Sequence, residues 1–258
     1  MGDYLLRDAA PFDEKMWAKI DELVVNVAKK LLVGRRFLEL VGPLGMGVEV
    51  VPRFGFTREG GAYVAAEKAE YLPLTELAAE FLLKARHLAM AGSSPLGPDL
   101  GAVAIATGEL AQAEDKLVIG GLLAGAGSSA PLGDWDTLGG PFKAVAAAIA
   151  KLRGAGFTGP YAAVMSPEMY ARLAGLMQHG RREVEMVERL LGAGLFQSTV
   201  VPVGQVLLLS PQDWNVDLVV GQDIITAYVG NEGLDHRFRI FETLTLRIKR
   251  PEAICLLK

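Results

Sequence analysis

The segment most diagnostic of the fold is GRRFLELVGPLG, residues 34–45, which follows the first predicted helix. A second segment, VGQDIITAY at residues 220–228, begins the last part of the chain. Runs of β-branched and apolar residues next to glycine, proline and aspartate are typical of strands bounded by turns. We therefore predict strands near 36–41 and 47–52 around the first segment. Around the second segment we predict strands at 216–221 and 224–229.

The helix before residue 34 carries more apolar surface than one core contact needs. Asp13 is the expected N-cap and Gly34 the expected C-terminal stop of a helix over about 14–32. At about 100° per residue its apolar side chains cover an arc of roughly 200°. A surface helix needs a stripe only a little over about 100° wide. The excess predicts two buried faces, one toward its own domain and one toward something else.

Residues 54–70 are polar and contain glycine, and their weak periodicity predicts an extended hairpin or arm. In a monomer the entropy cost of ordering such an arm would be poorly offset by burial. In an assembly the arm can lie across a neighbouring subunit.

The rest of the chain predicts an α+β fold, with helices in the middle and strands mainly near both ends. Helices are expected over about 100–119, capped by Asp99, around Phe142 to Leu152, from Pro167 onward, and over about 183–192. A glycine-rich loop is expected at 120–129. Further strands are expected at 161–165, 196–201, 205–209, 237–249 and 253–257.

Composition narrows the function classes. Of the 258 residues 51% are hydrophobic but only 7% are aromatic, an aliphatic surplus that soluble chains often place in subunit contacts. The net charge is −4 without a basic run, so neither a nucleic-acid partner nor a membrane partner is expected. Cys255 is the only cysteine, which fits a reducing compartment. We expect no signal peptide and no membrane span, and hence a cytoplasmic protein.

The search for catalytic and metal-binding patterns returns none, so we expect no catalytic residues and no metal site. The three histidines are far apart in sequence, and no Glu-x-x-His, His-Glu-x-x-His, Cys-x-x-Cys or Gly-x-Ser-x-Gly pattern occurs. GAGFTG at 154–159 matches the letters of a dinucleotide fingerprint, but it ends a helix instead of opening one, so we expect a turn.

His179 lies in LMQHGRR, residues 176–182, a polar turn between two predicted helices. Two interpretations stay open. In the first, the turn is an exposed loop tip. In the second, several copies of the turn around a symmetry axis form a pore lined by His and Arg that attracts anions.

The two segments above, together with GPYAAV at 159–164, FRIFETLTLRI at 238–248 and PEAI at 251–254, resemble encapsulins. These are bacterial and archaeal shell proteins related to tailed-phage capsids. The resemblance implies the tailed-phage major-capsid-like fold, with a peripheral domain, an apical domain and an extended arm. It divides the chain into the N-terminal helix and start of the peripheral domain (1–53), the arm (54–71), the peripheral domain with its spine helix (72–131), the apical domain (132–220) and a return to the peripheral domain (221–258).

The resemblance also implies a function. Encapsulins form closed icosahedral shells in the cytosol and load a cargo enzyme through a short C-terminal peptide of the cargo, so the chain is expected to be a non-enzymatic shell subunit. Typical cargos are ferritin-like iron-storage proteins, the expected cargo here, and dye-decolourising peroxidases. By position, the cargo peptide would bind a groove whose apolar side chains seat its apolar residues, while Arg35 and Glu39 set its register. The groove residues would be Val24, Val27, Leu31, Arg35, Phe37, Glu39, Asp223, Ile224 and Ile225.

By position, too, the fivefold pore would be lined by Gln178, His179 and Arg181. The alternative for the groove is that part of its residues only pack the subunit core. Some encapsulins hold a flavin on a tryptophan, but FLLKARH at 81–87 has no aromatic residue at the stacking position, so we predict no cofactor.

Two other functions compete with a cargo shell. A phage or prophage major capsid protein would package nucleic acid, against which the net charge of −4 counts. A hydrolase acting alone would need a nucleophile–base pair that the sequence does not show.

Overall fold

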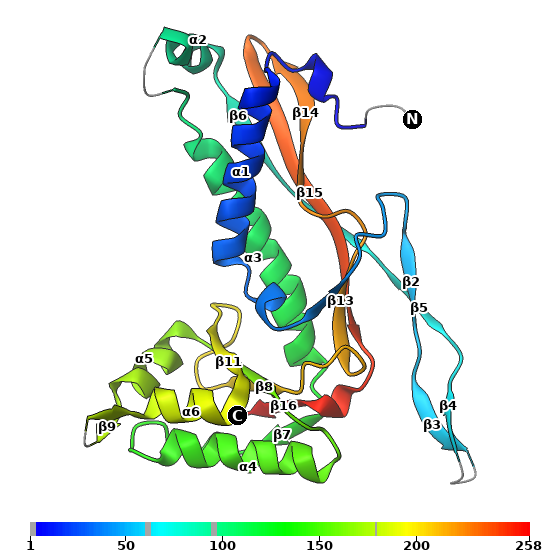
Figure 1. Ribbon diagram of the computed structural model, residues 1–258, viewed down its shortest axis with the longest axis vertical. Coiled ribbons are helices and arrows are strands. Elements are labelled where there is room, and N and C mark those ends of the chain that lie inside the picture. The colour runs from blue at the N-terminus through cyan, green and yellow to red at the C-terminus, as the bar shows by residue number, and fades with distance from the viewer. Residues whose placement is uncertain (1–3, 60–62, 94–96, 179) are drawn as a thin grey trace.

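The computed structural model describes residues 4–59, 63–93, 97–178 and 180–258 (Figure 1). The helices are α1 (Glu14–Leu31), α2 (Ala85–Ser93), α3 (Gly101–Ala124), α4 (Gly140–Gly154), α5 (Pro167–Gly175) and α6 (Glu183–Leu191), with short 3-10 helices η1 (Arg7–Ala9), η2 (Gly34–Arg36) and η3 (Pro251–Ala253). The strands are β1 (Glu39–Val41), β2 (Val50–Arg53), β3 (Phe56–Glu59), β4 (Tyr63–Ala66), β5 (Glu70–Pro73), β6 (Thr75–Leu83), β7 (Ser128–Ala130), β8 (Tyr161–Met165), β9 (Met177–Gln178), β10 (Arg181–Arg182), β11 (Gly192–Gln197), β12 (Val206–Leu209), β13 (Val216–Val220), β14 (Ile225–Glu232), β15 (Asp235–Ile248) and β16 (Ile254–Leu257).

The first sheet is organised around β15, the longest strand, in the order β1-β13-β15-β14 with β6 also paired to β15. At its edge β1, from the first diagnostic segment, runs parallel to β13, with Val41 opposite Val219, the residue just before the second segment. The contact continues beyond the strands, where the Leu44 amide donates to the Val220 carbonyl at 3.0 Å. Residues far apart in sequence are thus joined by backbone hydrogen bonds.

Helix α1 lies beside α3 over this sheet (Figure 1). Asp13 caps it as predicted, its Oδ1 accepting from the Met16 amide at 2.8 Å. Its buried residues recur every three or four positions; they are Trp17, Ile20, Val24 and Ala28. Trp17, Ile20 and Val24 pack with Phe81 and Phe238 of the sheet, whereas Ala28 packs with Leu32 and with Ala111 of α3. Gly34 is not its stop, since Leu32 is the C-cap and Gly34 opens η2.

The long helix α3 corrects two sequence expectations. It runs to Ala124, through the glycine run that was expected to be a loop at 120–129. A Cβ on Gly121 would come within 2.8 Å of Leu246 Cδ2, so this glycine lets the helix lie close to β15. Its N-cap is Leu100, while the Asp99 carboxylate accepts from the Gly101 amide at 2.9 Å.

The second sheet has the order β11-β8-β12-β16-β7 and separates two parts of the core. On one face, Met165 and Leu208 pack with the buried sides of α4, α5 and α6. On the other, Val164 and Leu207 pack with residues of α3 and the first sheet. Every residue of β8 and β12 is buried, because elements cover these strands on both faces of the sheet.

Strand β11 is displaced from its predicted position. It spans Gly192–Gln197, whereas 196–201 was expected. Gly192, at φ 83°, ends α6 and starts the strand at once. Beyond the strand, the Ser198 hydroxyl accepts from the Val200 amide at 3.2 Å, which turns the chain.

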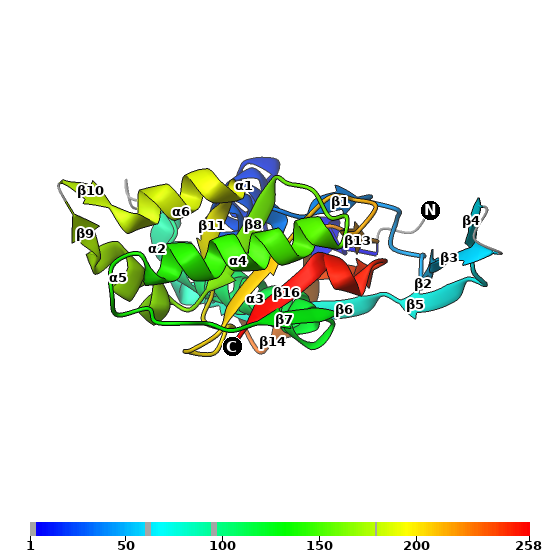
Figure 2. The same ribbon diagram turned by 90° about the horizontal axis from the view of Figure 1, so that it is seen from below.

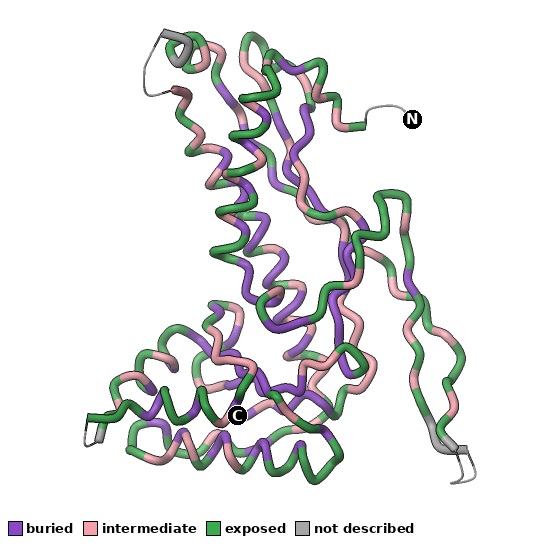
Figure 3. The backbone as a smooth tube through the Cα atoms, viewed as in Figure 1, coloured by how far each residue is buried: buried purple, intermediate pink, exposed green. Residues whose placement is uncertain are grey.

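The arm projects from the body as two antiparallel ladders, β2 with β5 and β3 with β4 (Figure 1). It begins at Val50, before the predicted residue 54, and the residues of the arm whose burial is described are mostly exposed or intermediate in Figure 3. Its base is joined to β15 twice: Arg53 Nη1 donates to the Ile248 carbonyl at 3.2 Å, and Arg247 Nη1 donates to the Pro52 carbonyl at 3.0 Å. Figure 2 shows a thin molecule with the arm at one end and the β9–β10 hairpin at the other.

Across the described ranges, no helix is both long enough and apolar enough to span a bilayer.

Candidate functional site

A groove of about 400 Å³ lies between α1, η2, β1 and the loop at 223–224. Its apolar lining consists of Val24, Val25, Ala28, Leu32, Leu40 and Ile224. Its charged lining consists of Lys29, Arg35, Arg36 and Asp223. Val25 is 46% exposed and Leu40 41% exposed, so the groove offers apolar surface that the core of the subunit does not use.

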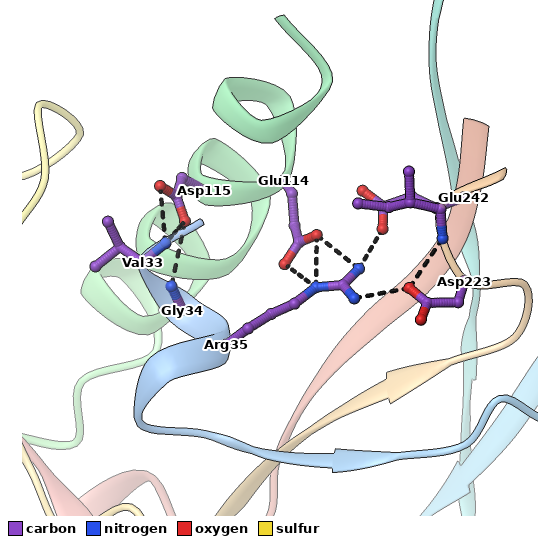
Figure 4. A network of polar contacts seen from close by, with 8 residues as sticks. Val33, Gly34, Arg35, Glu114, Asp115, Asp223 and Glu242 are labelled. Carbon is purple, nitrogen blue, oxygen red and sulfur yellow. Dashed lines mark hydrogen bonds and ion pairs between the residues drawn. The ribbon is translucent and has the colours of Figure 1, made fainter. Parts of the chain in front are cut away.

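Arg35 joins the elements that form this groove (Figure 4). Its Nε lies 2.9 Å from both carboxylate oxygens of Glu114 on α3. Its Nη2 donates to Glu242 of β15 at 2.5 Å, and its Nη1 donates to Asp223 at 2.7 Å. The same Asp223 oxygen accepts from the Ile224 amide at 2.8 Å, so Arg35 indirectly sets the position of the wall formed by Ile224.

The electrostatics of this cluster are set by burial. The Glu114 and Glu242 side chains are fully buried, and the Arg35 side chain is 13% exposed. Burial, followed by the negative charge of Glu114, raises the pKa of Glu242 to about 9 against the opposing effect of Arg35. Glu242 therefore keeps a proton at neutral pH.

Arg35 stays charged in this setting. Burial is the largest single influence and opposes its charge, but the hydrogen bond and attraction from Glu114, together with Glu242 and Asp223, raise the pKa of Arg35 above its ordinary value. Arg35 thus faces the buried carboxyl groups of Glu114 and Glu242 beneath the groove, with the exposed Asp223 carboxylate at its edge.

Asp115, next to Glu114 on α3, holds the turn between α1 and η2. Its Oδ1 accepts from the amides of Val33 at 3.0 Å and Gly34 at 3.2 Å (Figure 4). Burial is the main cause that raises the pKa of Asp115. A Cβ on Gly34 would lie 2.7 Å from Val118 Cγ1, so glycine permits this close approach to α3.

The structure brings together four of the nine residues predicted for the groove. These are Val24, Arg35, Asp223 and Ile224. Arg35 belongs to η2 and Phe37 is its C-cap, so the predicted strand at 36–41 is shortened to Glu39–Val41.

The other five predicted residues lie outside the lining. Val27 is half-buried on α1, and Ile225 begins β14. Leu31 lines a neighbouring cavity of about 240 Å³. Phe37 is buried against Phe196, with ring centroids 5.2 Å apart. Glu39 is exposed on β1.

Sequence reasoning did not assign six lining residues to the groove. Val25, Ala28 and Leu32 were available from the wide apolar arc of α1. Lys29, Arg36 and Leu40 had no comparable signal, because their place depends on how η2 and β1 turn under the helix.

The predicted pore residues fall on the β9–β10 hairpin. Gln178 and Arg181 are opposite one another in this ladder, and Arg181 is exposed. His179 lies outside the described residues. Among the residues that the structure describes, no cluster of three or more His, Cys, Asp or Glu side chains has the arrangement of a metal site.

Comparison with known proteins decides the family. The family model described as "Encapsulating protein for peroxidase" matches residues 2–245. The type 1 encapsulin shell protein EncA of Myxococcus xanthus is 35% identical over 279 aligned residues, which cover 100% of this chain and 97% of that protein. The chain belongs to the encapsulin family. As an encapsulin it is a shell subunit, a structural protein and not an enzyme.

Two relatives join an encapsulin shell to another protein. A diheme-cytochrome-encapsulin shell fusion protein of Kuenenia stuttgartiensis is 33% identical, covering 94% of this chain and 72% of that protein. A ferritin-like-encapsulin shell fusion protein of Pyrococcus furiosus is 29% identical, covering 76% of this chain and 55% of that protein.

Solved structures confirm the predicted capsid-like fold of this encapsulin. A virus-like particle from Pyrococcus furiosus matches with a TM-score of 0.82 at 24% identity, covering 95% of this chain and 100% of that one. Mycobacterium phage Che8 matches with a TM-score of 0.63 at 16% identity, covering 88% of this chain and 91% of that one. At these identities the likeness concerns the fold alone.

Proposed function

We propose that this encapsulin subunit assembles into a closed icosahedral shell in the cytoplasm and encloses a cargo protein that docks through its C-terminal peptide. The docking site is the groove between α1, η2, β1 and residues 223–224. The observation that carries this proposal is its exposed apolar lining, in which Val25 and Leu40 remain open to solvent. An extended peptide with apolar residues would remove this surface from water.

The charged groups around the groove have different roles in this docking. The three nitrogens of Arg35 contact carboxylates of the subunit itself, so Arg35 holds the groove in shape. Lys29 and Arg36 line the groove without belonging to this cluster. They are better placed than Arg35 to select the register of a bound peptide, and Glu39 on β1 is exposed beside Leu40.

For the cargo we propose a ferritin-like iron-storage protein. The supporting observation is that a relative from Pyrococcus furiosus is named as a fusion of a ferritin-like protein with an encapsulin shell. A dye-decolourising peroxidase is the competing cargo, because the matching family model is described as encapsulating a peroxidase. In both cases redox chemistry belongs to the cargo, and the shell supplies confinement.

We also propose that copies of the β9–β10 hairpin surround a pore, with Gln178, His179 and Arg181 toward the opening. The support is that Arg181 and Arg182 are exposed on a hairpin at one end of the molecule (Figure 2). A ring of arginines raises the local concentration of anions.

The docking proposal is tested with Ile224→Asp, which places a charge in the apolar lining. Shells of this variant are expected to assemble and to lack cargo, because a buried carboxylate without a partner opposes docking of an apolar peptide. Ile224→Val, which keeps the surface apolar, is the matched control and should load normally. Electron microscopy reports assembly, and gel densitometry of purified shells reports loading. Full loading of Ile224→Asp shells would refute the groove.

The cargo is identified by purifying shells from the native host, followed by mass spectrometry of their contents. A ferritin-like protein is the expected result. Finding a peroxidase instead would change the proposed cargo and leave the proposed docking groove as it is. Shells filled with nucleic acid, seen as a high ratio of absorbance at 260 to 280 nm, would overturn the cargo proposal as a whole.

A further inference from the structure

Glu183 is a buried acid directly after the two exposed arginines of the β9–β10 hairpin. It is the first residue of α6, and it is 2% exposed. Its carboxylate reaches a different element: Oε2 accepts from the Gly139 amide at 2.8 Å and Oε1 from the Phe142 amide at 2.9 Å. Both amides belong to the N-terminal end of α4, whose own N-cap, Gly139, offers no side chain.

These contacts replace a missing cap. A helix leaves its first amides without partners inside the helix, and its N-terminal end favours negative charge. Gly139, at φ 83°, adopts a conformation that favours glycine, so a capping side chain cannot come from that position. The carboxylate of Glu183 therefore satisfies α4 from across the contact between α4 and α6.

The backbone of Glu183 closes the base of the hairpin at the same time. Its amide donates to the Leu176 carbonyl at 3.0 Å, next to the ladder in which Arg182 faces Met177. One residue thus closes the hairpin through its backbone and fastens it to α4 through its side chain. Hydrogen bonds to an ionised group are among the stronger ones in proteins.

We infer that Glu183 is the positioning residue of the β9–β10 hairpin, and that it sets where Arg181 and Arg182 lie around the pore. This inference rests on the proposed pore for its consequence in transport, but the anchoring of the hairpin to α4 stands on the contacts above. Without the carboxylate, the hairpin would keep its ladder and lose its two hydrogen bonds to α4, while the apolar packing of α6 would remain.

The test compares Glu183→Gln with Glu185→Gln in assembled shells. Both changes remove one negative charge from the first turn of α6, but Glu185 is exposed. Glutamine at 183 directs an N–H group toward one of the two α4 amides, so one of the two bonds is lost. Trypsin cleavage after Arg181 or Arg182 should become about tenfold faster in Glu183→Gln, because losing a bond to a charged group makes local opening more frequent. Glu185→Gln should be cleaved at the wild-type rate.

The second readout is selectivity, which a purely structural role would leave unchanged. A fluorescent protein enclosed during reassembly of the shells is quenched by iodide, an anion, or by acrylamide, which is neutral. The ratio of the two entry rates should fall in Glu183→Gln and stay at the wild-type value in Glu185→Gln. An unchanged ratio in Glu183→Gln, with trypsin cleavage also unchanged, overturns the inference.

Arg181→Gln separates this inference from the proposed pore. If this variant leaves the ratio unchanged, the pore assignment is wrong, and the anchoring is decided by trypsin alone. If Glu183→Gln fails to assemble, amide hydrogen exchange on wild-type shells tests whether Glu183 anchors the hairpin to α4. A peptide covering residues 139–142 should then exchange as slowly as the interior of α4, and rapid exchange there overturns the anchoring.

Discussion

Replacing Arg35 by methionine tests whether the charged cluster beneath the groove holds α1, α3 and the first sheet together. Methionine keeps an unbranched apolar side chain and removes the guanidinium group, which contacts Glu114, Glu242 and Asp223. The change leaves the fully buried Glu114 and Glu242 side chains without their cationic partner. Removing one member of a buried ion pair costs about 3–5 kcal/mol. For a chain of this size that corresponds to a fall in melting temperature of roughly 6–20 °C.

The assay is thermal unfolding of cargo-free shells followed by tryptophan fluorescence. Arg36→Met is the matched control, since the Arg36 side chain is exposed and its Nη2 donates to the Lys30 carbonyl at 2.6 Å, with no carboxylate as partner in that bond. Its melting temperature should fall by about 4 °C at most. The double variant Arg35→Met/Glu114→Gln should recover part of the loss, because the unpaired charge is then gone. Equal melting temperatures for Arg35→Met and Arg36→Met would refute the reasoning.

The remaining predictions concern pH and one glycine. Glu242 is protonated in the folded subunit up to pH about 9 and ionises in the unfolded chain near pH 4.5, so between these values its contribution to stability falls as pH rises. The free energy of unfolding changes by at most about 1.4 kcal/mol per pH unit from this group. Glu242→Gln should therefore make the melting temperature less dependent on pH between pH 6 and pH 9. The same dependence on pH in the wild-type protein and in Glu242→Gln would contradict the assignment. Gly42→Ala should lower the melting temperature by several degrees, because Gly42 has φ 130° and a Cβ there would lie 2.2 Å from the Val220 carbonyl oxygen. Gly47→Ala, where no atom lies within 4 Å of the added Cβ, is the control, and equal losses in both would show that the contact between the two diagnostic segments does not matter.

Local signals in the sequence were enough for most of the secondary structure. The side chain of Asp13 predicted where α1 begins, and the wide apolar arc of this helix includes its buried residues Trp17, Ile20 and Val24. Short apolar runs bounded by turn residues predicted β8, β12 and β16 close to their observed bounds. Such signals work because capping and periodicity involve residues within a few positions of one another.

The same local rules failed where a residue serves a distant contact. Gly120 and Gly121 resemble a loop in sequence, yet they lie inside α3, because Gly121 makes room for Leu246 of β15. Leu31 belongs to the apolar arc of α1, but the packing of α3 and residues 197–200 assigns it to a different cavity from the groove. An apolar arc shows how much surface a helix will bury and not which neighbour will cover it.

By itself the sequence determined the family, the capsid-like fold and the excess apolar surface of α1, because these depend on segment order and on residues near one another. The tertiary structure alone decided what the charged residues do. Arg35 meets Glu114, Asp223 and Glu242 across separations of 79, 188 and 207 residues, and Glu183 caps a helix that begins 43 residues earlier. The reason is physical: an ion pair or a cap supplied from another element depends on distance in space, which only the packing of the two sheets and their helices establishes.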